Sequence, residues 1–241
     1  MKTKAWHRSV GALCFPLVLW LSIVSNASIG LFLLAFLIYL SISITVTSGY
    51  HRLFTHSFYQ CHKLWHWVYG FIGTISLNSS PVEWSTVHIA HHKHSDTEDD
   101  PYDTSFKHFF RFKDRNNIKP TKNEIRLLKD PMHKFFMKNS LTLSIVFGII
   151  TMLCGLQIFL FVYALPVTLY LLTSGLHTIY AHDHRGAKNL WFMEFLIPMA
   201  GEWIHKEHHD NPRRHIFNHK PHYFDLGGFF INLIKYDKPT T

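Results

Sequence analysis

Four charge-free apolar runs constrain the fold of this chain more than any other feature, and they lie at about residues 10–25, 29–48, 141–156 and 158–174. A helix needs about 20 mostly apolar residues to cross the hydrocarbon core of a bilayer. The second run reaches this length and the other three are short. Buried core helices are the alternative, but four of them would leave a chain of 241 residues too little polar surface. We therefore expect four transmembrane helices.

The basic residues indicate how these helices are oriented. The links inside the first pair and inside the second pair of runs contain no Lys or Arg, whereas "MKTKAWHR" and residues 49–140 and 175–241 hold all of them. Since basic loops stay cytoplasmic, we expect two helical hairpins with both termini in the cytoplasm, in a bacterial inner membrane or the endoplasmic reticulum. The first run, which ends near the small residues Ser25 and Ala27, also fits a cleaved signal peptide; a retained anchor is favoured because the second run follows at once.

The composition favours a lipid environment. A net charge of +8 attracts negatively charged partners, and 21 Phe, 10 Tyr and 7 Trp suit a chain that meets the membrane interface. Nucleic acid is therefore not an expected partner. The apolar stretch from Leu64 to Leu77 is too short to span, so we expect a buried or interfacial helix there. The basic stretch from Lys107 to Lys138 is either a solvated face or a site for a negatively charged headgroup.

Histidine motifs recur in the polar segments. "HRLFTH" contains His51 and His56, "HIAHH" contains His88, His91 and His92, "HKEHH" contains His205, His208 and His209, and His177 stands alone just past the fourth run. On a helix, residues three and four apart share a face, so an H-x-x-H-H segment is expected to aim its imidazoles in one direction. His51 and His56 are five apart, about 140° around an α-helix. Either they serve two different ions or the helix bends.

The nine imidazoles of these motifs predict a metal centre. Nine nitrogen donors exceed what one ion accepts, so a two-metal centre follows if all nine bind. The cysteines Cys14, Cys61 and Cys154 are scattered and lack CxxC spacing, so we expect no thiolate ligands and no disulfides. Imidazole suits Zn, Cu, Fe and Ni. Iron with an open position for dioxygen is the natural candidate, and zinc stays open on spacing alone.

The other histidines and the nearby acids have weaker signals. His94 and the pair in "AHDHRG", His182 and His184, are further candidates to join the site, but we expect each of them to support the site from outside its ligands or to be exposed. The acids after the second motif either accept the second N–H of ligating imidazoles or form a solvated turn closed by Pro101; they are Asp96, Glu98, Asp99 and Asp100. The histidines without a neighbouring motif are expected to be structural: His7, His62, His66, His108, His133, His215, His219 and His222.

These motifs resemble those of the membrane fatty acyl desaturases of the stearoyl-CoA desaturase type. The matching stretches are "HRLFTH", "EWSTVHIAHHKHSDTEDDPYD" and "GEWIHKEHHDNP", in the order and placement of that family, and the resemblance runs from about the second apolar run to the C-terminus. It implies a cytoplasmic oxidoreductase with two iron ions that uses dioxygen and two electrons to introduce a cis double bond into a saturated acyl chain. The ligands that it implies are His51, His56, His88, His91, His92, His177, His205, His208 and His209.

The sequence departs from the family pattern in several places. Thr173 stands four residues before His177, where the family usually has an Asn that holds a water on one iron. Thr86 and Val87 replace the Arg-Asp pair of the animal acyl-CoA enzymes, which weakens the case for coenzyme A as acyl carrier against acyl carrier protein or a membrane lipid. Trp203 replaces a usual Gly. With no fused haem domain, we expect electrons from a separate donor, such as ferredoxin or a haem protein with its reductase.

Taken together, the runs and the resemblance predict an all-α integral membrane protein with residues 1–241 as one desaturase domain. Four transmembrane helices in two hairpins would carry a cytosolic helical cap, residues 49–140 and 175–241, that holds the di-metal site. A closed apolar tunnel would select the carbons that react, and Trp84 is either a wall of that tunnel or plain packing. A hydroxylating relative is the main alternative; a metal transporter is disfavoured because its ligands would lie near the bilayer midplane.

Overall fold

Helices make up most of the structure. The computed structural model describes residues 6–102, 121–183, 186–211, 214, 216–217 and 220–236. In chain order the elements are α1 (Trp6–Val24), α2 (Ile29–Ile44), η1 (Thr45–Thr55), α3 (Lys63–Ile75), α4 (Pro81–His94), α5 (Lys122–Leu127), α6 (Pro131–Leu153), α7 (Leu156–Ile158), η3 (Phe159–Ala164), α8 (Leu165–Tyr180), β1 (His182–Asp183), β2 (Gly186–Ala187), α9 (Met193–Leu196), α10 (His205–Asp210) and α11 (Leu226–Ile234). The antiparallel pair β1–β2 is a small departure from the all-α prediction.

Within the described residues, three helices are long and apolar enough to cross a membrane. They are the continuous helix Ile29–Thr55 formed by α2 and η1, the helix α6, and the continuous helix Leu156–Tyr180 formed by α7, η3 and α8. The remaining expected span coincides with α1, whose described apolar part, Gly11–Val24, is shorter. Exposed apolar side chains such as Leu17, Leu37 and Ile149 lie on α1, α2 and α6, as expected of helices that face lipid. A count of four spans and their two-hairpin orientation stay predictions.

The helices extend beyond the apolar runs from which the spans were predicted. The second run was expected to end at residue 48 and continues as helix to Thr55, and the fourth continues from residue 174 to Tyr180. The helix α6 begins at Pro131 instead of residue 141, because the Asp130 carboxylate accepts the Met132 N–H at 3.0 Å and Pro131 occupies the first helical position. Polar residues, histidines among them, thus continue the apolar helices.

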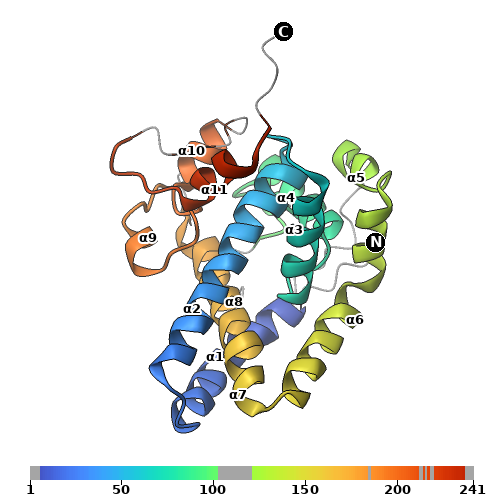
Figure 1. Ribbon diagram of the computed structural model, residues 1–241. Helices are drawn as coiled ribbons and strands as arrows, with labels where there is room; N and C mark the ends of the chain where they lie inside the picture. Colours follow the sequence, from blue (N-terminus) through green and yellow to red (C-terminus); the bar gives the residue numbers. More distant parts are fainter. Residues whose placement is uncertain are drawn as a thin grey trace.

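The smaller helices gather at one end of the long ones. In Figure 1 the helices α2, α6 and α8 run through the lower half of the molecule, and α3, α4, α10 and α11 surround their upper end. An aromatic core fills this junction, with Tyr39, Tyr50, Phe54, Tyr69 and Phe136 at most 1% exposed. The expected helix after Leu64 is confirmed as α3, which packs against η1 and α6.

A buried ion pair fastens α11 to η1. The guanidinium nitrogens Nη1 and Nη2 of Arg52 donate to the Asp225 carboxylate at 2.9 Å each, and both side chains are fully buried. Asp225 also accepts the backbone N–H groups of Phe217 and Gly228 at 2.8 Å. Arg52 directly follows His51 in the motif "HRLFTH", so this ion pair fixes that motif relative to α11.

Candidate metal centre

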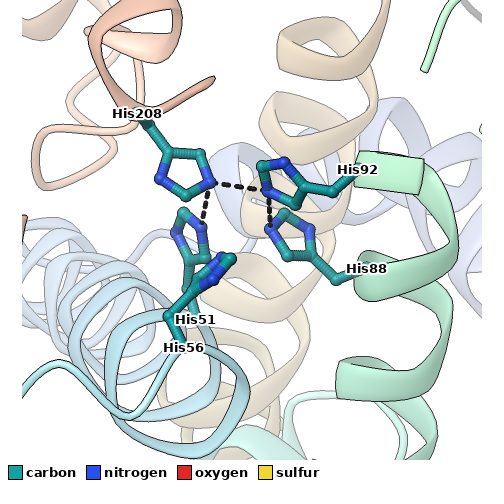
Figure 2. A group of neighbouring side chains, drawn as sticks. All are labelled: His51, His56, His88, His92 and His208. Atoms are coloured by element: carbon teal, nitrogen blue, oxygen red, sulfur yellow. Dashed lines mark hydrogen bonds between the residues drawn. The ribbon is translucent and has the colours of Figure 1, made fainter. Parts of the chain in front are cut away.

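Five of the predicted ligands form one group. One ring nitrogen from each of these five imidazoles lies within 4.8 Å of all the others, and the members are His51, His56, His88, His92 and His208. Figure 2 shows their rings facing a common point from three segments, η1, α4 and α10. These segments are far apart in the sequence, so only the tertiary fold brings the group together.

The π-helical geometry of η1 resolves the five-residue spacing of its two histidines. The His56 N–H donates to the His51 carbonyl at 3.1 Å, which is the i→i+5 bond of a π-helix. Residues five apart are therefore stacked along the helix, with the two ring centroids 5.0 Å apart. The helix is wider here than an α-helix, and this brings both rings into the same group. The sequence left open whether the two histidines serve two different ions or whether the helix changes its geometry, and the structure favours the second alternative, with one shared ion.

A capping box starts α4 and so sets which way its histidines point. The Ser80 hydroxyl accepts the Glu83 N–H at 3.2 Å, the Glu83 carboxylate accepts the Ser80 N–H at 3.1 Å, and Pro81 takes the first position. His88 and His92, four residues apart, join the first group, whereas His91 lies about 100° around the helix from His92 and joins a second group. The expectation that all three imidazoles of this motif share one direction was therefore wrong.

The second group contains His91, His182, His205 and His209, whose donor atoms also lie within 4.8 Å of one another. The helix α10 mirrors α4, because His205 and His209 serve the second group while His208 serves the first. The two groups adjoin, with the rings of His92 and His209 only 4.5 Å apart between centroids. Each H-x-x-H-H motif therefore contributes to both groups.

The nitrogen spacing in the first group cannot be explained by hydrogen bonds alone. His208 Nε2 lies 2.9 Å from His51 Nε2 and 2.7 Å from His92 Nε2, and His92 Nε2 lies 3.0 Å from His88 Nε2. A neutral imidazole nitrogen offers either one proton or one lone pair, so one atom cannot satisfy two such neighbours well. A shared cation satisfies all of them. The buried His56 Nε2 also lacks a hydrogen-bond partner, which is the state of a donor kept for a metal.

Three carboxylates hold the outer nitrogens of the two groups. The Nδ1 atom of His51 lies 2.9 Å from Glu202 Oε1, that of His91 lies 2.9 Å from Asp100 Oδ1, and that of His182 lies 3.1 Å from Asp96 Oδ1. Imidazoles that bind metals usually donate their second N–H to a carboxylate in this way. Asp96 and Asp100 thus take the orienting role that the sequence left open, whereas Glu98 and Asp99 are exposed.

Burial lowers the pKa, and so favours the neutral form that a metal requires, in seven of the nine clustered imidazoles, namely His56, His88, His92, His182, His205, His208 and His209. Desolvation, followed by the neighbouring histidines, lowers the pKa of His56, His92 and His209 to about 2. Burial alone would raise the pKa of Glu202, but its interactions with His51, and then with Arg52 and His177, outweigh burial and lower that pKa to about 2. The pocket therefore combines neutral nitrogen donors with ionised carboxylates behind them, which is the protonation state of a metal site.

His177, expected as the ninth ligand, lies beside the second group without belonging to it. Its Nε2–H donates to the Glu202 carbonyl at 2.9 Å, and its ring packs against the fully buried Trp203 at 5.0 Å between centroids. Thr173 is also buried, and its hydroxyl donates to the Tyr170 carbonyl at 3.0 Å. Its role as a water holder stays a prediction.

A cavity of about 60 Å³ lies between the two groups. Its lining includes His51 and His88 of the first group, His91 and His205 of the second, and the side chains of Trp84 and Tyr102. Trp84 stacks on His88 with 4.7 Å between ring centroids, and Tyr102 stacks on His91 at 4.6 Å. The sequence had left Trp84 open between tunnel wall and packing, and it lines the cavity while packing on a histidine.

The remaining sequence expectations have mixed outcomes. His62 is structural, since its Nδ1 accepts the Leu64 N–H at the start of α3. His66 and His133 are apart from both groups and face Phe54. His182 joins the second group, although we expected it to support the site from outside its ligands or to be exposed. The predictions for His108, His184, His215, His219 and the basic residues 107–120 lie outside the described residues, as does the side chain of His7.

Comparisons with known proteins identify the family. No protein-family model matches the chain. The sn-2 palmitoyl-lipid 9-desaturase of Nostoc sp. (strain 36) is 31% identical over 203 residues, covering 75% of this chain and 69% of that protein. The sn-1 stearoyl-lipid 9-desaturase of Anabaena variabilis is 28% identical over 202 residues, covering 77% and 72%. The Delta(9)-fatty-acid desaturase fat-5 of Caenorhabditis elegans is 27% identical over 238 residues, covering 86% and 71%. The chain therefore belongs to the membrane fatty acid desaturase family, whose members are oxidoreductases.

Proposed function

We propose that this desaturase binds two iron ions in its two histidine groups and uses dioxygen and two electrons to introduce a cis double bond into a saturated acyl chain. The observation that carries the proposal is the pair of adjoining, buried imidazole groups with a cavity between them. Their donors come from segments between His51 and His209. This spread supports treating residues 1–241 as one desaturase domain.

The number and spacing of donors favour iron over zinc. Zinc sites in proteins are almost always four-coordinate and tetrahedral, whereas the first group offers five imidazoles. With metal–nitrogen bonds of about 2.1 Å, neighbouring donors are about 3.0 Å apart in an octahedron and about 3.4 Å apart in a tetrahedron. The nitrogens of His51, His92 and His208 are 2.7 and 2.9 Å apart along this group, close to the octahedral spacing.

The residues of the chain prepare the site for oxidation of an unactivated methylene. When bound, reduced iron supplies the dioxygen chemistry that a protein side chain cannot. Glu202, Asp100 and Asp96 hold protons on the outer nitrogens of three imidazoles, so that the inner nitrogens face the ions. Trp84 and Tyr102 close the cavity with aromatic surface, which excludes water and limits side reactions.

The acyl chain enters from the membrane side of the cavity. Val46 of η1, Tyr170 of α8 and Met199 line it together with the histidines, and the first two lie on helices long enough to span a bilayer. A chain held there presents specific carbons to the metal groups, because position in a closed site fixes which bonds react. In this proposal electrons come from a separate donor protein, the membrane helices form two hairpins, and the site lies on the cytoplasmic side.

The test is fatty-acid profiling of cells that make no unsaturated fatty acids of their own. Expression of the wild-type chain is expected to yield new cis-alkenes, located by mass spectrometry, and lipid-class analysis reports which acyl carrier is used. His92→Ala should abolish them, because His92 contacts both His88 and His208. His94→Ala is the matched control on the same helix, since His94 is in neither group. Hydroxylated acyl chains from the wild type would identify the hydroxylase instead, and unchanged lipids with folded, iron-loaded protein would refute both.

A further inference from the structure

We propose that His182 is the fourth imidazole ligand of the second metal ion, in place of His177, and that Asp96 is the residue that positions it. The inference rests on the proposed function in that it requires two bound ions. It assigns to the second ion the ligands His91, His182, His205 and His209.

The position of the His182 ring carries the first part of the argument. Its Nε2 lies 2.8 Å from His205 Nε2, the same short spacing as between donors of the first group. The ring centroids of His91, His205 and His209 lie 5.0, 4.7 and 5.1 Å from that of His182. The side chain is only 2% exposed. His182 therefore faces the same point as three predicted ligands, at nearly equal distances.

The contact with Asp96 fixes which nitrogen of His182 is free to bind. A neutral imidazole carries one proton, and Asp96 accepts it from Nδ1 at 3.1 Å. The lone pair of Nε2 then points toward His205 and the centre of the group. His51 with Glu202 and His91 with Asp100 have the same arrangement. Each of these pairs has an inner Nε2 and an outer Nδ1 on a carboxylate, so His182 matches two predicted ligands.

The turn after α4 is built to present Asp96. Asp96 has a φ of 62°, a left-handed conformation that Asp and Asn tolerate better than most residues. Its N–H donates to Asp100 Oδ2 at 3.0 Å, so the two carboxylates that hold His182 and His91 are fixed within one turn. This turn therefore couples the last turn of α4 to the segment just after α8.

His177 is committed to a different bond. Its Nε2 faces the Glu202 carbonyl, which only accepts hydrogen bonds, so this nitrogen carries the proton and cannot bind a metal while the bond exists. The other nitrogen, Nδ1, is not among the donor atoms of the second group that lie within 4.8 Å of one another. The Glu202 carboxylate in turn holds His51. His177 is therefore a positioning residue that fixes the backbone of Glu202, with Trp203 packed against its ring.

Iron content separates the two histidines. The purified full-length chain and its variants are reconstituted anaerobically with ferrous iron, dialysed against a weak chelator and assayed for iron per chain. The wild type should retain two ions, His182→Gln one, and His177→Gln two, because glutamine at 177 keeps an N–H donor for the Glu202 carbonyl. Asp96→Asn should retain the second ion about 10-fold to 100-fold less tightly in a chelator titration.

Thermal unfolding of each variant shows whether it is folded, and should His182→Gln fail to fold, Asp96→Asn carries the test. The inference is overturned if His177→Gln loses an ion, if His182→Gln keeps both, or if Asp96→Asn holds iron as tightly as the wild type. Those results would leave the desaturase function intact. A folded wild type that retains no iron would instead remove the metal centre on which the proposed function depends.

Discussion

The buried pair Arg52–Asp225 gives the sharpest prediction about stability. Asp225→Asn keeps the size of the side chain and one oxygen acceptor but removes the negative charge of the carboxylate that both Nη atoms of the buried Arg52 contact. Breaking a buried ion pair by removing one partner costs about 3–5 kcal/mol. For a chain of this size each kcal/mol lowers the melting temperature by about 2–4 °C, so the expected fall is roughly 6–20 °C.

The assay is thermal unfolding of detergent-solubilised protein, followed by the fluorescence of its 7 tryptophans. Asp210→Asn is the matched control, because it makes the same substitution in an Asp that is paired with a cation, Lys206, but the two side chains are 53% and 50% exposed. An exposed pair of this kind contributes about 0.3–0.5 kcal/mol, so the control should shift by less than about 2 °C. Arg52→Met added to Asp225→Asn should recover part of the loss, since it removes the buried cation whose carboxylate contact the first substitution took away. The reasoning fails if Asp225→Asn and Asp210→Asn melt alike, or if the double variant melts lower than Asp225→Asn.

Three further predictions follow from the packing and the charges. Burial raises the pKa of Glu194 to about 7 despite its bonds to three backbone N–H groups, so this carboxyl alone contributes a loss of roughly 3 kcal/mol of stability as the pH rises from 4.5 to 7. Glu194→Gln cannot titrate, so the free energy of unfolding of the wild type minus that of this variant should fall by about this amount over the same pH range in denaturation curves. Gly73→Ala should lower the free energy of unfolding by about 1–3 kcal/mol, because the new Cβ would lie 2.5 Å from the Tyr50 ring. Gly30→Ala is the control, since its new Cβ would have its nearest neighbour at 3.6 Å and should not lower the stability. Equal melting temperatures of the two variants would contradict this. Chelation of iron should lower the melting temperature of the wild type, since it leaves buried nitrogens such as His56 Nε2 unpaired. An unchanged melting temperature after measured loss of the metal would argue against the site.

Much of the metal centre could be predicted from local sequence. The spacing of His88 and His92, and of His205 and His209, is a helical repeat, and the structure places each pair in one group. The division of each motif between two groups was not predictable in the same way. It depends on how α4 and α10 are rotated relative to each other, and helix rotation follows from packing against η1 and its neighbours.

Predictions for single residues were least informative where the contact partner lies far away in the sequence. His182 has no histidine at helical spacing within a motif of the expected kind, and its partners Asp96 and His205 lie 86 and 23 residues away in the sequence. His177 is the opposite case, because the family resemblance implies that it is a ligand. That resemblance carries no information about the Glu202 carbonyl, which accepts the hydrogen bond of its Nε2. The spacing of His51 and His56 was open until the backbone of η1 showed i→i+5 hydrogen bonds.

By itself the sequence determined that this chain is a mostly helical membrane protein of the desaturase family with histidines enough for two metal ions, because hydropathy, helical spacing and motif order are properties of neighbouring residues. The tertiary structure alone decided where the helices end, which imidazoles face each other and which carboxylate stands behind each one. These depend on capping, on the widened turn of η1 and on contacts between remote segments, such as His51 with His208, which are 157 residues apart in the sequence. No local pattern encodes such contacts, since they form only when burial of the whole core fixes the helices against one another.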